Sequence, residues 1–331
     1  MDTNSSNLIN ELRRAGLSRE AIDAAWPNWW SDEVAASESG RAELRFVLAR
    51  KLGLAPKSLL GERIEFVWKD RARFKNLTNQ DSVQQDILSS FGVAVGRLLL
   101  RGAHIGAGFS NLAAMTLRDA ILQHSQYVDL KQLLSACWGL GVPVIQLRVF
   151  PLAAKSAHAM VIELNGRCAI ILGRDSNYPA VTAFTLAHEI GHIAHRHLDG
   201  ALALVDAEDP AKANEQDSQE LEADAFGLTL LTGSANPVIS TNVDEFNSPT
   251  LAAASLRAAA EYRIEPGTLA LCLAYRKKNW PVAMSALRFI YPDAKPVWSE
   301  INGIAKSMID WESVGAEGSE FLQNLMGIED V

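Results

Sequence analysis

The chain has 331 residues, of which 48% are hydrophobic and 21% charged, a composition that supports a large buried core and excludes an intrinsically disordered protein. Its formal net charge of −8 argues against a global electrostatic attraction to nucleic acid or to an anionic membrane. No apolar stretch is long enough to span a bilayer, and the polar start "MDTNSSNLIN" predicts no secretory signal. The isolated cysteines Cys137, Cys168 and Cys272 indicate buried thiols in a reducing compartment, so we expect a cytoplasmic protein.

Residues 1–62 predict a small helical module. The segments "LINELRRAG", "SREAIDAAW" and "RAELRFVLARKLG" carry helical apolar patterns, with Ser18 as a helix start and glycines as stops. Residues 63–79 are polar and in part basic, and we expect them to form a linker. A core over residues 80–232 and a helical region over residues 233–331 complete the expected organisation.

The expected core changes from helical to strand periodicity in its middle. Residues 80–100 and 108–140 predict helices, whereas the following segments "VPVIQLRV", "HAMVIEL" and "CAIILG" are short, β-branched and bounded by turns. The Asn-Gly pair at 165–166 predicts a hairpin between the last two strands. Helices over residues 179–198 and 218–232 come next. The fold class is therefore α+β, mostly helical, with a small antiparallel or mixed sheet.

The helix predicted over residues 179–198 contains His188, Glu189 and His192 in the order H-E-x-x-H. Residues four apart share one face of a helix, so the two histidines can hold one metal ion. Glu189 lies about 100° around the helix, beside the position that a water molecule would take. A catalytic zinc site has three protein ligands and an open position for water, which the ion makes more acidic. The motif therefore predicts a Zn²⁺ site with Glu189 as its general base.

The third protein ligand is expected on the helix predicted by "SQELEADAFG". His195 lies too close along the first helix to complete an open site, and we expect His195 and His197 to face solvent or to support a ligand. Glu220 and Asp224 share a helical face whose other residues are small, which allows a close approach to the first helix. We predict Glu220 as the ligand and Asp224 as the carboxylate that holds a ligand histidine in one tautomer. Glu222, on the opposite side, is the alternative ligand.

The segments "GVPVIQL", "VIELNGRCAIIL", "FTLAHEIGHIAHRHL" and "ELEADAFGLTLL" resemble the ImmA/IrrE family of zinc metallopeptidases, over about residues 135–232. The resemblance implies a gluzincin-like core, in which two histidines and a glutamate from the next helix hold the zinc ion. It also implies a protease that cleaves helix-turn-helix repressors in stress responses, mobile elements or phage defence. The sequence departs from the family pattern in "LLTGSANP" and at Arg196, and neither departure touches a proposed ligand.

Residues 1–62 also resemble a degraded helix-turn-helix domain of the Xre type, in "LRRAGLSREAIDAA" and "LARKLGLAPKSLL". The place of the recognition helix is taken by "PNWWSDEV", which carries two tryptophans and two acids. This region contains eight basic and nine acidic residues, a balance of charge that does not favour binding to DNA. Nucleic-acid binding is therefore weakly supported, including by the locally basic residues 63–75, and a protein-binding or intramolecular role is an equal alternative.

The sequence is compatible with two functions. The first is a zinc endopeptidase of narrow specificity that cleaves a helix-turn-helix repressor. The alternative is a DNA- or partner-binding regulator whose metal site is structural or weakly active. For the peptidase, Tyr178, Tyr262 and His195 are candidates to stabilise the oxyanion.

We also expect one strand of the hairpin over residues 158–173 to form an open sheet edge beside the metal. An extended substrate could add to such an edge through main-chain hydrogen bonds. Open edges are normally protected, so a flanking segment should cover this one at rest. The candidates are the N-terminal helices, with Trp29 and Trp30 as anchors, and residues 250–331.

Overall fold

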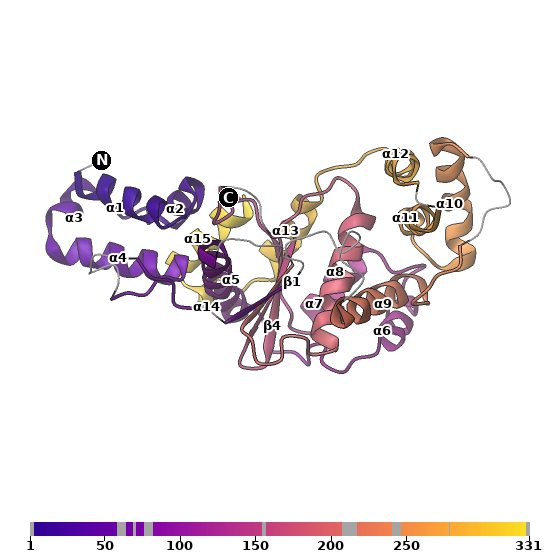
Figure 1. The fold of residues 1–331 in the computed structure, drawn as a ribbon, viewed down its shortest axis with the longest axis horizontal. Helices are drawn as coiled ribbons and strands as arrows, with labels where there is room; N and C mark the ends of the chain where they lie inside the picture. The colour runs from indigo at the N-terminus through magenta and orange to yellow at the C-terminus, as the bar shows by residue number, and fades with distance from the viewer. Residues whose placement is uncertain are drawn as a thin grey trace.

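A five-stranded mixed sheet lies in the middle of the molecule, with helices on both of its faces (Figure 1). This arrangement, seen in a computed structural model, confirms the expected α+β, mostly helical class. The structure describes residues 3–57, 64–68, 71–75, 82–153, 157–206, 217–239, 246–277 and 279–328.

The strands have the order β1-β5-β3-β4-β2 across the sheet. The central pair β3 and β4 is antiparallel, and β5 is antiparallel to β3, whereas β2 and β1 run parallel to β4 and β5. Asn165 and Gly166 adopt left-handed φ values of 54° and 74°, so the predicted Asn-Gly hairpin is confirmed. The strand bounds are β1 Ala72–Lys75, β2 Val144–Gln146, β3 Ala159–Leu164, β4 Arg167–Leu172 and β5 Ala203–Asp206.

The two strands β1 and β5 are not expected from the sequence. They come from the expected linker and from the connection between the helices predicted over residues 179–198 and 218–232, and four residues carry too little periodicity to mark a strand. Their pairing places both hairpin strands inside the sheet, since β3 lies between β5 and β4, and β4 lies between β3 and β2. The prediction that the hairpin offers an open edge is therefore wrong.

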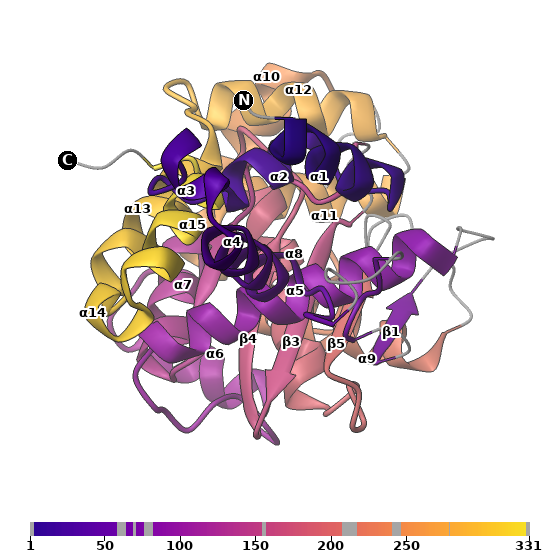
Figure 2. The same ribbon diagram turned by 90° about the vertical axis from the view of Figure 1, so that its left-hand side faces the viewer.

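One face of the sheet is covered by α5, Ser82–Gly102, which packs against β3 and β4. The N-terminal helices lie beyond α5, in front of the sheet in Figure 2. They share one hydrophobic core with α5, the sheet and the C-terminal helices. The bounds on this side are α1 Thr3–Arg14, α2 Arg19–Ala25, α3 Asp32–Ala36, α4 Glu38–Leu52, α14 Trp311–Val314 and α15 Ala316–Met326.

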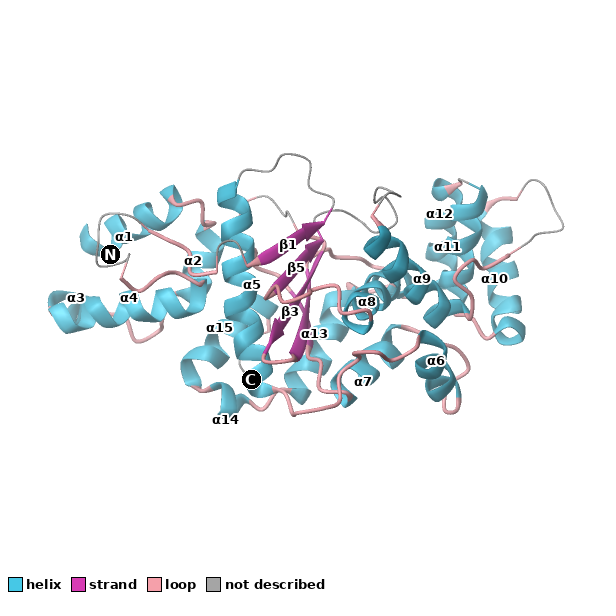
Figure 3. Cartoon of the chain, turned by 60° about the horizontal axis from the view of Figure 1, so that its bottom comes forward, coloured by secondary structure: helices cyan, strands magenta, loops and turns pink. Residues whose placement is uncertain are grey.

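The other face of the sheet is covered by α8, Pro179–Ala194, with α9, Ser218–Thr232, packed beside it (Figure 3). Helices α10, α11 and α12 form a separate cluster at the far end of the molecule, next to α8. The remaining bounds are α6 Ala114–Leu122, α7 Leu130–Gly139, α10 Ser248–Tyr262, α11 Pro266–Lys277, α12 Trp280–Ile290 and α13 Val297–Met308.

The N-terminal helices and α8 therefore lie on opposite sides of the sheet (Figure 1). The prediction that these helices cover the metal site is wrong. Their tryptophans instead make contacts within this half of the molecule: Trp29 Nε1 donates to Glu317 of α15 at 3.4 Å, and Trp30 Nε1 donates to the Ser5 hydroxyl at 3.1 Å.

All three cysteines are free thiols, and Cys137 and Cys168 are buried. Among the helices that the structure describes, we find none with both the length and the apolar character needed to cross a membrane.

The contact between α5 and β3 depends on Gly96. A Cβ atom at this position would lie 2.6–3.0 Å from three side-chain carbons of Ile162. We expect Gly96→Ala to destabilise the fold by about 1–3 kcal/mol through overpacking. Gly303→Ala is the matched control, because a Cβ there meets nothing within 4 Å. Chemical unfolding should show no loss of stability in the control, and equal stability of both variants would contradict the packing argument.

Candidate metal centre

Helix α8 carries the H-E-x-x-H motif into the interior between the sheet and α9. Pro179 occupies its first turn, where the missing N–H is not needed. His188, Glu189 and His192 are each 0% exposed. The two helices approach closely because Gly191 faces the backbone of Ala223, at 3.0 Å from a Cβ placed on the glycine. The small residues predicted for the facing side of α9, together with Gly191 of α8, thus bring the two motifs together.

Four buried side chains converge on one point: His188, His192, Asp206 and Glu220. One ligand atom from each lies within 4.8 Å of all the others. His188 Nε2 is 3.4 Å from Glu220 and 3.5 Å from Asp206. His192 Nε2 is 3.6 Å and 3.8 Å from the same two carboxylates. The sequence singles out three of these four residues and misses Asp206, which ends β5.

The outer nitrogens of both histidines are engaged by other side chains. His188 Nδ1 lies 2.8 Å from Asp224 Oδ1, the carboxylate that is expected to hold a ligand histidine. His192 Nδ1 lies 2.9 Å from His197 Nδ1, and His197 Nε2 lies 3.0 Å from Glu222 Oε2. In the tautomer that leaves His192 Nε2 free to bind a metal, Nδ1–H donates to His197, which in turn donates to Glu222.

These contacts also distinguish between Glu220 and Glu222, the two carboxylates of α9 that are candidates for the third metal ligand. Glu220 lies in the buried cluster, whereas Glu222 is exposed and lies against His197. The side of α9 that carries Glu222 also carries Phe226 and Thr229, and together they line a hollow of about 590 Å³. His195, His197 and Glu222 form a second group of possible ligands there, and the rings of His195 and His197 stack at 5.5 Å.

The donor set fits a metal ion. Glu189, Asp206 and Glu220 are buried, and within the described part of the chain none of their six carboxylate oxygens has a hydrogen-bond partner. A positive charge, Lys75 Nζ, lies 3.8 Å from Glu220 but is also bonded to Asp217 at 2.6 Å. Buried carboxylates without partners are costly. A divalent cation among them would supply the missing positive charge.

The directions of the pKa shifts in the cluster also indicate that it favours a positive charge. Burial opposes a charge on His188, but the carboxylates of Asp206, Asp224 and Glu220 outweigh it and raise the pKa of His188 well above its ordinary value. Burial and the neighbouring His188 lower the pKa of His192 to about 3. Burial and the nearby Asp206 raise the pKa of Glu189 well above its ordinary value. The centre thus favours one positive charge among its carboxylates.

None of the three candidates for stabilising the oxyanion lies in this cluster. Tyr178 precedes α8 and stacks on Tyr291 at 6.1 Å, and it lies ten residues before His188, about 15 Å along the helix axis. Tyr262, at the end of α10, is 59% exposed. His195 faces the hollow beside Glu222.

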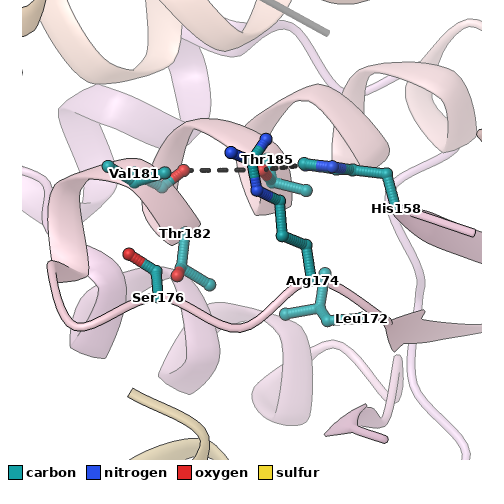
Figure 4. Close-up of a pocket in the computed structure, with 7 residues that line it drawn as sticks. All are labelled: His158, Leu172, Arg174, Ser176, Val181, Thr182 and Thr185. Atoms are coloured by element: carbon teal, nitrogen blue, oxygen red, sulfur yellow. Dashed lines mark hydrogen bonds between the residues drawn. The ribbon is translucent and has the colours of Figure 1, made fainter. Parts of the chain in front are cut away.

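A second, much smaller hollow lies beside the first half of α8 (Figure 4). In it His158 Nε2 lies 3.0 Å from the Thr185 hydroxyl, one turn before His188. Its volume of about 10 Å³ has room for about one water molecule and not for a substrate side chain. This hollow is therefore not a specificity pocket. Its contact between His158 and Thr185 links the start of β3 to α8.

The contact between Asp224 and His188 yields a prediction. We expect Asp224→Ala to weaken metal binding about 10–100-fold, because the ring loses the partner that fixes its tautomer. Glu222→Ala acts on His192 only through His197 and should weaken binding less. Competition with a chromogenic chelator measures both, and a larger effect of Glu222→Ala would contradict this ranking.

One comparison with known proteins gives a family match that covers this part of the chain. Residues 144–263 match the family model Peptidase_M78, described as an IrrE N-terminal-like domain. The matched segment begins at β2 and runs into the first residue after α10, so it contains all four converging side chains. No curated protein matches the chain.

Proposed function

Because residues 144–263 belong to the ImmA/IrrE peptidase family, we propose that this protein is a zinc-dependent endopeptidase of narrow specificity. His188, His192 and Glu220 are the proposed metal ligands, and Glu189 is the proposed catalytic base. The observation that carries the proposal is the convergence of both histidine Nε2 atoms and Glu220 next to Glu189, whose two oxygens have no partner among the described residues.

In this function the chain's own groups have separate tasks. A zinc ion would supply Lewis acidity, making water more acidic and polarising the carbonyl of the peptide bond. Glu189 takes a proton from the attacking water and passes it to the leaving amine. Asp224 holds the ring of His188, and the chain from Glu222 through His197 holds the ring of His192. The buried surroundings of Glu189 raise its pKa and so favour its action as a base that must also release a proton.

The proposed substrate is a helix-turn-helix transcriptional repressor, cleaved in a stress, mobile-element or phage-defence circuit. The family supports a protein substrate, and the repressor is the substrate that the resemblance implies. The test is to incubate the purified protein with a helix-turn-helix repressor encoded by a neighbouring gene. Mass spectrometry should show defined fragments that disappear with a chelator and return with added zinc. Intact repressor with the zinc-loaded protein would contradict this choice of substrate.

A second candidate function is a DNA- or partner-binding regulator whose metal is structural. One observation favours it: Asp206 adds a fourth protein side chain to the cluster, and structural zinc sites are closed by four protein ligands. Removal of the fourth side chain has a different consequence for each candidate. A peptidase gains access to its metal, whereas a structural site loses only stability.

A further inference from the structure

Asp206 is held in the interior by the strand that it ends. Its backbone carbonyl accepts a hydrogen bond from the N–H of His158 at 2.6 Å, and its register partners are Ala159 in β3 and Lys75 in β1. The side chain is 1% exposed. Strand pairing on both sides therefore directs this carboxylate into the cluster.

The spacing of the four converging side chains is close to that of ligands around one tetrahedral ion. Zinc bonds of about 2.0–2.2 Å place neighbouring tetrahedral ligands about 3.3–3.6 Å apart. Between the two histidine Nε2 atoms the distance is 2.9 Å, and from these atoms to Glu220 and Asp206 the distances are 3.4–3.8 Å. Asp206 thus stands 0.1–0.2 Å farther from the two histidine nitrogens than the proposed ligand Glu220.

The carboxylate of Asp206 has no other assignment in the described structure. Neither of its oxygens has a hydrogen-bond partner there. The histidine nitrogens nearest to it, at 3.5 Å and 3.8 Å, are too far for good hydrogen bonds and are the two that face the centre. The nitrogens that orient the rings are already engaged by Asp224 and His197. Asp206 therefore does not serve to orient the histidines.

We propose that Asp206 is a fourth protein ligand, which fills the coordination position that a peptidase needs for water and keeps the resting enzyme latent. This inference rests on the proposed metal site. Because β5 pairs with β3 and also carries Asp206, an extended segment that replaces β5 would withdraw Asp206 and uncover β3 in one step. Entry of a substrate strand and opening of the metal site are thereby coupled.

The test uses the full-length protein loaded with Co²⁺, whose visible spectrum reports coordination, and azide as a small probe ligand. The wild type should show a spectrum that azide does not change, because the fourth position is filled. Asp206→Ala should show an altered spectrum that azide changes with saturation. Asp206→Asn, which keeps the volume of the side chain, should behave like Asp206→Ala and guards against a failure of the alanine variant to fold.

Asp199→Asn is the matched control. Asp199 lies in the same connection between α8 and β5 and binds Arg73 of β1 at 2.8 Å, but it is exposed and outside the cluster. The control should keep the wild-type spectrum and its insensitivity to azide. An equal response of the control and Asp206→Ala would trace the effect to loosening of β5 and overturn the assignment. So would a wild-type spectrum that already responds to azide.

Metal affinity, measured by competition with a chelator, separates this inference from the proposed function. We expect the loss of Asp206 to weaken zinc binding at least about 10-fold, since even outer partners of ligands contribute that much. Unchanged affinity in Asp206→Ala, with one metal bound in every variant, would overturn the fourth ligand and leave the peptidase site intact. Absence of stoichiometric metal in the wild type would overturn the proposed function itself.

Discussion

Replacing Glu189 with glutamine is expected to stop cleavage while the metal stays bound. Glutamine keeps the shape and hydrogen-bonding reach of the side chain but cannot accept a proton from water. A general base contributes about 10²–10⁴-fold to a rate. The rate of repressor cleavage should therefore fall by at least about 10²-fold. Single-turnover assays with excess enzyme would measure the loss.

Metal content is the necessary control for this variant. Glu189 is not among the four converging side chains, so Glu189→Gln should bind zinc with wild-type stoichiometry. The substitution also removes a buried carboxylate that has no partner among the described residues, and unfolding should show stability at or above that of the wild type. Proteolysis that survives in the zinc-loaded variant would contradict the role of Glu189 as the base.

Glu220→Ala is expected to weaken zinc binding more than the substitution of either Asp224 or Glu222. Glu220 is 2% exposed and lies 3.4 Å and 3.6 Å from the inner nitrogens of His188 and His192. Its removal should weaken zinc binding by more than the roughly 10–100-fold that outer partners cost. The melting temperature should no longer rise when zinc is added, because the metal then binds the folded state too weakly to stabilise it.

Glu222→Ala is the matched comparison, since the same type of side chain is removed two residues away on the same helix. Its carboxylate lies against His197 and outside the cluster, so most of the zinc affinity should remain. Full zinc binding in Glu220→Ala combined with its loss in Glu222→Ala would mean that the wrong carboxylate of α9 was chosen. If Asp206 is a ligand, Glu220→Ala with Asp206→Ala should bind zinc more weakly than either single variant.

Local sequence patterns determined the parts of this protein that are built from long or strongly marked elements. The four-residue spacing of His188 and His192 on α8, and the small-residue face of α9 that carries Glu220 and Asp224, result from helical periodicity over more than ten residues. The Asn-Gly turn between β3 and β4 depends on two adjacent residues that favour left-handed conformations. These signals are contained in short segments, so they can be found without knowing the rest of the fold.

Only the tertiary structure decided which segments complete the sheet and the cluster. Strands β1 and β5 have four residues each and come from distant parts of the chain, and they form because each satisfies the backbone hydrogen bonds of its neighbour. That pairing closes the edge of β3 and brings Asp206 to the histidines. An aspartate at the end of "ALVD" has no local feature that marks it as a ligand. Its role depends on a register between strands, which is set by packing across the whole sheet.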